Sequence, residues 1–294
     1  MKKIISGNSS KGGRKFAERL KMDQVFRERI SLLRRKCAGT EWIKRASLEG
    51  LKVQKIKREK DYKKIKNSLD KKLKTSSGFS CIARLCGFIA GDGSIKRRRD
   101  GNGFDHYDIA FYPDNLSMAK TFINTFEKIY CKKPSIVPLN NFYSVRVSSK
   151  IACDHLLGIS TFDTHNWRVP DFVFSNVSYQ SEFLRAIFDC ESHVSKNNIQ
   201  FQSVNPDGIN QLRGLLANFE IDSKIYRYQR KNSRWNINYI LVIGKKESIK
   251  KYAELIGFNH SAKINRLSIL AGVPERLMGQ SRKLVSEKIP RFES

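Results

Sequence analysis

The feature that most restricts the fold of this 294-residue chain is a degenerate internal repeat. Residues 80–160 and residues 178–260 both read as helix, hairpin, helix, hairpin, helix, and residues 161–177 join them. A shared spacing at both ends of the unit is stronger support for a duplication than either helix pattern alone. Two landmarks keep the same interval of 99 residues: Gly158 to Gly257, and Asp92 to Glu191.

Local signals support this order of elements. Asp100-Gly101-Asn102-Gly103 is a strong hairpin turn in the first copy, and Lys196-Asn197-Asn198 takes the same place in the second. Apolar residues recur on one face of residues 116–129, as in an amphipathic helix. The sequence therefore predicts an α+β protein made of two pseudo-symmetric αββαββα units.

The charge of the chain points to a polyanionic partner. Lys and Arg total 56 against 28 Asp and Glu, which gives a net charge of +28. Nucleic acid is the first candidate, and an anionic membrane surface is the second and weaker one. The apolar content of 40% is enough for a folded core, which argues against a disordered chain.

Most of the excess charge lies before the repeats. Residues 1–79 hold 25 Lys and Arg against 8 Asp and Glu. Helical periodicity predicts a basic helical extension, with residues 75–78 as the linker that leaves it. Two interpretations stay open for this segment: solvated helices packed loosely on the body, or an accessory nucleic-acid-binding segment. Residues 261–294 are predicted to be a helical tail, without an assigned function.

The apolar runs and the cysteines indicate the cellular compartment. No apolar run is long enough for a transmembrane helix, and the N-terminus lacks the apolar core of a signal peptide. The six cysteines form no C-x-x-C pair and mostly sit in apolar runs. We expect free thiols in a reducing, intracellular compartment, either cytoplasm and nucleoid or an organelle matrix.

The first helix of each copy ends in an acidic residue. Residues 85–93 read LCGFIAGDG, and residues 184–192 read LRAIFDCES. These stretches resemble the LAGLIDADG motif of homing endonucleases of the monomeric, two-repeat type. The resemblance covers about residues 80–260, because the order of helices and hairpins around each motif also matches. It implies a saddle of two sheets that straddles double-stranded DNA.

The residues themselves favour a paired acidic site. Small residues such as Gly87 and Ala186 allow two helix backbones to approach closely, which would bring Asp92 and Glu191 together at the helix ends. Two adjacent carboxylates repel each other, and a divalent cation removes that cost. Hard oxygen ligands suit Mg²⁺, or another divalent metal such as Mn²⁺. Such an ion can activate water and stabilise the leaving oxygen of a phosphodiester.

The resemblance adds further candidates. It implies that the backbone carbonyls of Gly91 and Cys190 also reach the metal. It also implies a basic catalytic residue after the fourth strand of each copy, here Lys150 and Lys245, with Lys246 as a rival to Lys245. Asp114, Asn115 and Asn205 are candidates for holding the water network. The sequence departs from the motif at Ala90 and at Ser192, and the second departure puts the turn after Glu191 in doubt.

The predicted hairpins carry side chains suited to DNA. A two-stranded ribbon fits the major groove, Arg prefers guanine, and Gln prefers adenine. Only alternate residues of a strand face one way, so about half of the candidates can touch DNA. The candidates are Lys96, Arg97, Arg98, Arg99, Tyr107, Arg146, Lys196, Gln200, Gln202, Arg227, Gln229, Arg230, Lys231 and Arg234.

Together these features predict a monomeric, site-specific homing endonuclease that makes metal-dependent double-strand breaks. The two halves differ in sequence, so we expect an asymmetric target. The ends of the sequence carry no splicing residues, which favours a free-standing, intron-encoded protein over an intein. Two alternatives share the fold: an RNA maturase that assists splicing of an intron RNA, and a DNA-binding regulator. The regulator would tolerate loss of the two acids, and both are present.

Overall fold

The computed structural model describes residues 23–37, 41–101, 103, 105–229 and 236–278. The chain divides into two compact units, Met1–Asp61 and Tyr62–Ser294. The first unit contains helix α2 (Gln24–Cys37) and most of helix α3 (Glu41–Lys72), whose last turns belong to the second unit. Within the first unit, apolar side chains such as Val53 and Ile56 are exposed.

The first repeat opens with α4 (Ser76–Asp92), which Thr75 caps by accepting a hydrogen bond from the Gly78 amide. The predicted linker at residues 75–78 is therefore wrong, because Thr75 begins a helix and the next residues form its first turn. The other elements of this repeat are β1 (Gly93–Arg99), β2 (Asp105–Phe111), α5 (Leu116–Tyr130), β3 (Ser135–Pro138), β4 (Tyr143–Ser148) and α6 (Lys150–Ile159).

The second repeat follows the same order after the short helix α7 (Asp171–Phe174). Each repeat forms its own four-stranded antiparallel sheet, with the orders β1-β2-β4-β3 and β5-β6-β8-β7. The predicted α+β fold with two αββαββα repeats is confirmed. The elements of the second repeat are α8 (Val177–Glu191), β5 (Ser192–Val194), β6 (Ile199–Ser203), α9 (Pro206–Ala217), β7 (Lys224–Tyr228), β8 (Asn238–Ile243) and α10 (Lys246–Leu255).

One face of each sheet is apolar and packs against helices. In the first repeat, Phe111 of β2 stacks on Phe122 of α5 at 4.8 Å between ring centroids. In the second, Phe201 of β6 packs on Phe188 of α8 at 5.0 Å. The opposite face of each sheet is open. Alternation along the strands therefore decides which side chains face the core and which face outward.

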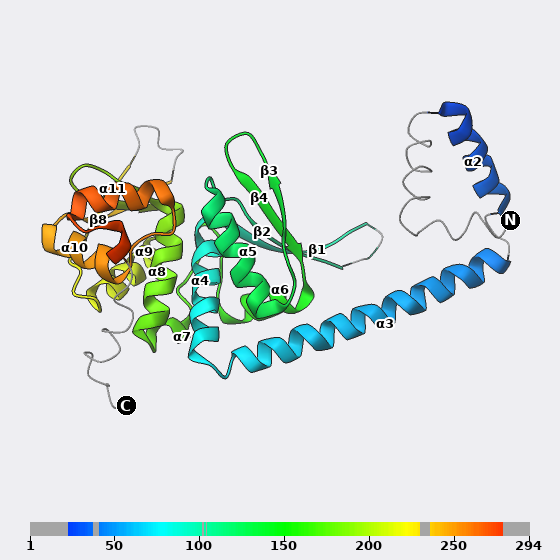
Figure 1. The fold of residues 1–294 in the computed structure, drawn as a ribbon, viewed down its shortest axis with the longest axis horizontal. Helices are drawn as coiled ribbons and strands as arrows, with labels where there is room; N and C mark the ends of the chain where they lie inside the picture. The colour runs from blue at the N-terminus through cyan, green and yellow to red at the C-terminus, as the bar shows by residue number, and fades with distance from the viewer. Residues whose placement is uncertain (1–22, 38–40, 102, 104, 230–235, 279–294) are drawn as a thin grey trace. The chain divides into compact units, whose positions relative to one another are not determined.

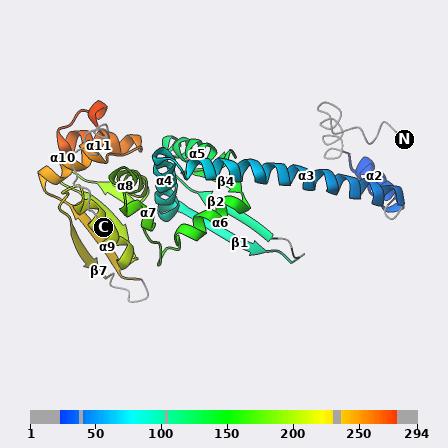
Figure 2. The same ribbon diagram turned by 90° about the horizontal axis from the view of Figure 1, so that it is seen from below.

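Helices α4 and α8 lie side by side in the middle of this unit. Figure 1 shows the elements of the first repeat on one side of the pair and those of the second on the other, and Figure 2 shows the two helices nearly end-on. Arg84 on α4 pairs with the buried Glu182 on α8 at 2.6 Å. The Ser80 and Ser178 hydroxyls, near the N-terminal ends of the two helices, lie 3.3 Å apart. The two helices therefore run parallel.

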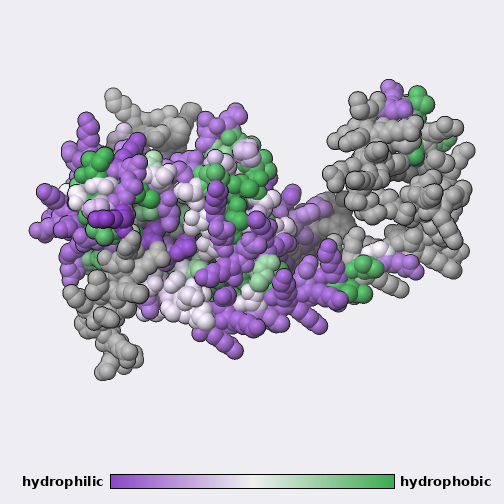
Figure 3. All heavy atoms as spheres, in the orientation of Figure 1, coloured by the Kyte–Doolittle hydropathy of each residue, from purple (hydrophilic) through white to green (hydrophobic). Residues whose placement is uncertain are grey.

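Helix α3 contributes to the core of the second unit through its last turns. Ile65 and Leu69 are buried, and the Ser68 hydroxyl donates to the Ile129 carbonyl at 3.0 Å. The last two turns of α3, which lie within the basic extension predicted for residues 1–79, thus pack on the first repeat. Figure 3 shows hydrophilic residues over much of the surface of this unit.

After the second repeat the chain forms α11 (Ser261–Ala271) and a 3₁₀ turn, η2 (Glu275–Leu277). Leu267 and Ala271 of α11 are buried, so this part of the predicted tail belongs to the folded unit. The rest of the predicted tail lies outside the described residues. Within the described ranges, no helix has both the length and the apolar character to span a membrane.

Candidate nuclease centre

Small residues set the distance between α4 and α8. A Cβ atom on Gly87 would come within 2.5 Å of the Phe183 carbonyl oxygen and 2.9 Å of the Ala186 Cβ. A Cβ on Gly91 would come within 2.4 Å of the Cys190 Cβ. At Gly87 and Gly91 the neighbouring helix therefore leaves no room for a larger residue. The close approach continues to the last turn of both helices, where each leads into the first strand of its sheet.

Asp92 and Glu191 are the last residues of these two helices. Desolvation, together with a smaller contribution from the negative charge of Asp92, raises the pKa of Glu191 to about 7, although the residue is exposed to solvent. Desolvation also raises the pKa of Asp92, with a smaller contribution from Asp114, while a hydrogen bond from Cys190 lowers it. The structure therefore brings together the two acids that the sequence paired.

The donor set fits a hard divalent cation. Two mutually repelling carboxylates in a partly dehydrated site gain from a cation between them, and both supply oxygen ligands. Among the described residues, no group of three or more His, Cys, Asp or Glu side chains converges on such a position. Asp92 and Glu191 would therefore hold a metal together with backbone carbonyls and with oxygens from another molecule, such as a phosphodiester.

The two lysines predicted to assist this centre lie elsewhere. Ser149 donates its amide to the Tyr107 carbonyl, and the Lys150 Nζ lies 5.7 Å from the centre of the Tyr107 ring. Along β2, Tyr107 is four residues from Phe111, the strand partner of Gly93. At about 3.3 Å per residue this is roughly 13 Å. The assignment of Lys150 to the acid pair is wrong, because the register of β4 carries it to the far end of the sheet.

Lys245 is displaced for the same reason. Ile243 pairs with Ile199 on β6, whereas Ser192, which follows Glu191, pairs with Phe201. The Lys245 ammonium instead pairs with Asp222 at 2.7 Å. Its assignment to the acid pair is therefore also wrong.

Lys263 of α11 is the basic residue that the structure places beside the acids. Its positive charge lowers the pKa of Asp92 and of Glu191. Its Nζ donates to the carbonyl of Asp189, to that of Phe188 at 3.2 Å, and more weakly to that of Cys190 at 3.5 Å. No sequence signal indicated Lys263, because it lies more than 70 residues from α8 and outside both repeats.

The polar candidates separate into two groups. Asp114 is close enough for its charge to act on Asp92. Asn115 caps α5 and donates to the Ser261 hydroxyl at 3.1 Å, so its side chain is committed to the fold. Asn205 is buried, caps α9, and donates to the Trp167 carbonyl at 2.6 Å. Its side chain is thus committed to the fold and not to a water network.

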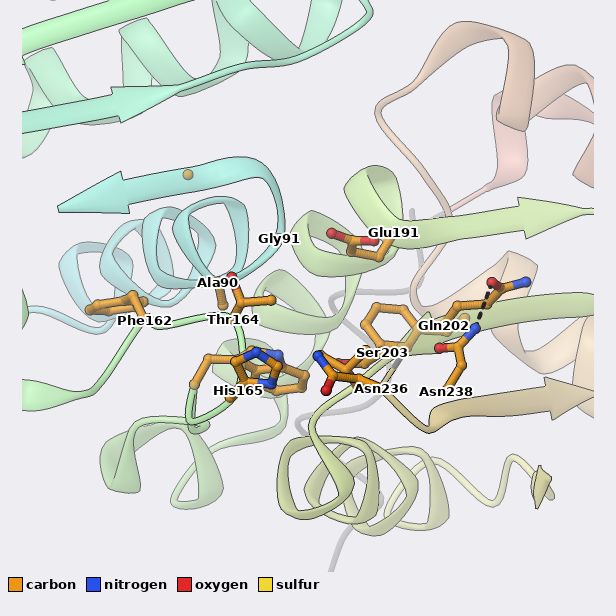
Figure 4. Close-up of a pocket in the computed structure, with 14 residues that line it drawn as sticks. Ala90, Gly91, Phe162, Thr164, His165, Glu191, Gln202, Ser203, Asn236 and Asn238 are labelled. Atoms are coloured by element: carbon orange, nitrogen blue, oxygen red, sulfur yellow. Dashed lines mark hydrogen bonds between the residues drawn. The ribbon is translucent and has the colours of Figure 1, made fainter. Parts of the chain in front are cut away.

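A pocket of about 500 Å³ opens beside Glu191 and the end of α4. Its other walls are the segment between the repeats, the end of β6, and the start of β8. Figure 4 shows Glu191 above this pocket, with His165, Asn236 and Asn238 around its lower part. The Asn238 amide donates to the Gln202 side chain at 3.2 Å, which joins β8 to β6 at this rim.

Strand alternation decides which predicted DNA contacts lie on the open faces. In the first sheet Ile95, Ile109 and Phe111 face the core, so the open face carries the alternate positions. Of the predicted residues, Lys96, Arg98 and Arg146 lie on this open face, and all three are exposed.

Three predicted contacts of the first sheet lie on the opposite side. Arg97 pairs with Asp154 of α6 at 2.9 Å and lies over the Tyr107 ring. Arg99 follows the same alternation and donates to the Gly103 carbonyl in the hairpin turn. Arg97, Arg99 and Tyr107 are thus among the candidates that alternation removes from the open face, because their strand positions point toward the helix-covered side.

In the second sheet Gln200 and Gln202 lie on the open face, and Lys196 is exposed in the hairpin turn. Arg227 lies on the other face, because it shares the phase of the partly buried, core-packed Ile225. Gln229 is exposed after β7, and Arg230, Lys231 and Arg234 lie outside the described residues. The open face also carries side chains that the sequence prediction missed: His193, Lys224, Tyr226, Tyr228 and Asn238.

Comparison with known proteins supports the fold of these repeats. Residues 178–257 match the family described as LAGLIDADG-like domain. The crystal structure of I-DmoI in complex with DNA and Mn has a TM-score of 0.50 and 17% sequence identity, and the match covers 61% of this chain and 97% of that one. A related structure describes I-DmoI as a homing endonuclease.

Curated relatives carry a similar segment inside much longer proteins. A glutamine--fructose-6-phosphate aminotransferase of Methanocaldococcus jannaschii is 24% identical over 64% of this chain and 17% of its own length. A replication factor C small subunit of Thermococcus kodakarensis is 25% identical over 66% of this chain and 21% of its own length. The chain thus spans about a fifth of the length of these relatives.

Proposed function

We propose that this chain, whose two repeats have the LAGLIDADG fold, is a site-specific endonuclease that makes metal-dependent double-strand breaks in DNA. One observation carries the proposal. The two repeat helices approach closely at Gly87 and Gly91 and end in Asp92 and Glu191, each directly before the first strand of an open sheet. A DNA duplex along both open faces would pass the acid pair.

The roles of the residues follow from their positions. Exposed cations such as Arg98, Arg146 and Lys196 would fix the phosphate backbone. Gln200, Gln202 and Asn238 offer the amide groups that recognise adenine in the major groove. Asp92 and Glu191 would hold the divalent ion, which supplies Lewis-acid stabilisation and an activated water when bound.

Two further properties belong to the proposal. The two open faces differ in every recognition residue named above, so the target is asymmetric and one chain suffices to bind it. Segments similar to this chain occur in proteins named for unrelated activities, an aminotransferase and a replication factor subunit. A segment common to such proteins does not carry either activity, which supports an origin in a mobile element. An intron as that element stays part of the proposal and does not rest on these relatives.

The proposal is tested on a library of plasmids with randomised 24-base-pair inserts. The purified chain is incubated with Mg²⁺ or Mn²⁺, and the cut ends are sequenced. We expect a single, non-palindromic site family, cut by the wild type and not by Asp92→Asn or Glu191→Gln. Equal cutting by all three proteins would refute the site, and palindromic sites would refute the single-chain arrangement.

The maturase and regulator alternatives are separated by two added assays with the same three proteins: a binding selection on the library and a splicing assay with intron RNA. A regulator would enrich an insert by binding, with no cut ends for any of the three proteins. A maturase would leave the DNA intact and accelerate splicing of its host intron RNA, with Asp92→Asn as active as the wild type. Either outcome replaces the nuclease proposal.

A further inference from the structure

The segment 259–263, which we call the strap, is fastened to the end of α8. The Asn259 amide and side chain donate to the Asp189 carboxylate at 2.9 and 2.8 Å, and the His260 amide donates to it at 3.0 Å. Asp189 is fully buried, so these bonds supply the partners that a buried carboxylate needs. Asp189 stands two residues before Glu191 and thus ties the strap to the last turn of the helix.

The strap is also fastened to the first repeat. The Ser117 hydroxyl donates to the Asn259 carbonyl at 2.9 Å, and the Asn115 amide donates to the Ser261 hydroxyl at 3.1 Å. The His260 Nε2 lies 3.3 Å from the Asp114 carboxylate. The strap therefore connects the end of α8 with the residues at the start of α5.

Lys263 completes the strap at the helix end. The last carbonyls of a helix have no partner within the helix, and a cation is favourable there. The Lys263 ammonium donates to the carbonyl of Asp189 and to that of Phe188, which also accepts from Ser192, and it makes a weaker contact with the carbonyl of Cys190 at 3.5 Å. The Cys190 carbonyl, expected from the sequence to be a metal ligand, is thus already in contact with a fixed positive charge.

We propose that the strap is part of the nuclease centre and that Lys263 is its positioning residue, which fixes the last turn of α8 and keeps the Cys190 carbonyl from a metal. A bound cation is then held by the carboxylates of Asp92 and Glu191 and by the end of α4, but not by the Cys190 carbonyl of α8. The two repeats therefore contribute unequally to the metal site. Only the assignment of the acid pair as a metal centre rests on the proposed function; the strap contacts do not.

The first test compares Lys263→Met, which keeps the length of the side chain, with Lys263→Arg, which keeps the charge. The matched control is Lys120→Met, at an exposed lysine of α5. In EDTA we expect Lys263→Met to lower the melting temperature by about 4–8 °C, at the 2–4 °C per kcal/mol usual for this size. Lys263→Arg should recover at least half of that loss, and the control should not change it.

The same variants report on the metal. Without the lysine charge, the acid pair is left uncompensated, so 5 mM Ca²⁺ should raise the melting temperature of Lys263→Met more than that of the wild type. An EDTA melting temperature equal to that of the control overturns the positioning role. A Ca²⁺ response equal to that of the wild type overturns the effect on the metal. Neither readout requires cleavage, so a failed nuclease assay leaves this result interpretable.

A measurement on the unmodified chain covers the case in which Lys263→Met does not fold. Acetylation of lysines under native conditions, read by mass spectrometry, should label Lys263 at least tenfold more slowly than Lys120, because its nitrogen is held against the three carbonyls. Labelling of both at the same rate would overturn the proposal. Hydrogen exchange at residues 188–192 should be slow in the same sample, and fast exchange there would contradict it.

Discussion

Asp92 and Glu191 are held in a position that costs stability in the absence of a counter-charge. The pKa of Glu191 is raised from 4.5 to about 7, so folding favours the protonated carboxyl. The unfolded chain releases this proton at a lower pH than the folded one. Stability is therefore lost as the pH rises from about 4.5 to 7.

This sign gives a prediction for the metal-free protein. In EDTA at pH 8, Glu191→Gln should melt at a higher temperature than the wild type, because the amide cannot ionise. At pH 5 the difference should largely disappear. Thermal unfolding at both values checks it. A destabilised variant at pH 8 would mean that the ionised carboxylate makes favourable contacts in the fold.

The two acids could be predicted from the sequence, whereas the basic residue beside them could not. The acids are the eighth residues of two similar nonapeptides, so a local pattern repeated at one interval locates both. Lys150 and Lys245 follow strands whose register the sequence does not determine, and the register carries them away. Lys263 reaches α8 through a contact between distant segments, for which one sequence contains no signal.

At the scale of elements, the seam between α4 and α8 is the contact that fixes the centre. Gly87→Ala should destabilise the protein by about 1–3 kcal/mol, because the added methyl meets the backbone of α8. The control is Gly214→Ala on α9, where an added Cβ meets nothing within 4 Å. This control should be neutral or stabilise by up to about 1 kcal/mol. Denaturant unfolding separates the two, and equal effects would contradict the seam.

Strand alternation gives a second prediction at this scale. Arg98 lies on the open face and Arg97 on the side of α6. Arg98→Ala should weaken DNA binding by about 1 kcal/mol or more, and Arg97→Ala should leave it nearly unchanged. Fluorescence anisotropy with a labelled duplex measures both. A larger loss for Arg97→Ala would place the DNA on the other face.

The order of strands and helices was predictable from periodicity and turn signals. Which residues of a single strand face the core was harder to predict. Ile225 and Tyr226 are both apolar enough to face a core, and the sequence alone does not show that Tyr226 faces outward. The start of α4 was missed because Ser76, Ser77 and Gly78 are typical of linkers. Thr75 instead caps the helix that these residues begin.

At the scale of the whole molecule, the charge divides between recognition and affinity. Exposed lysines such as Lys57, Lys60 and Lys64 belong to helix α3 and not to the strands that are proposed to recognise bases. If they bind phosphates, replacing all three with Gln should weaken binding to specific and random DNA equally. The slope of log affinity against log salt should become shallower by about one for each phosphate that is no longer neutralised. Titrations between 50 and 200 mM salt measure this slope. A change in the ratio of specific to random binding would assign these lysines to recognition.

The nuclease proposal requires that the two repeats place one carboxylate each at a shared, metal-dependent cutting centre. Its most direct test is the sequencing of cut ends from the randomised plasmid library with Mg²⁺, for the wild type, Asp92→Asn and Glu191→Gln. We expect one asymmetric family of sites for the wild type. Each variant should lose cutting by at least about 100-fold, a size typical of removing a group that stabilises the transition state. Cutting by either variant at the wild-type rate would contradict the proposal.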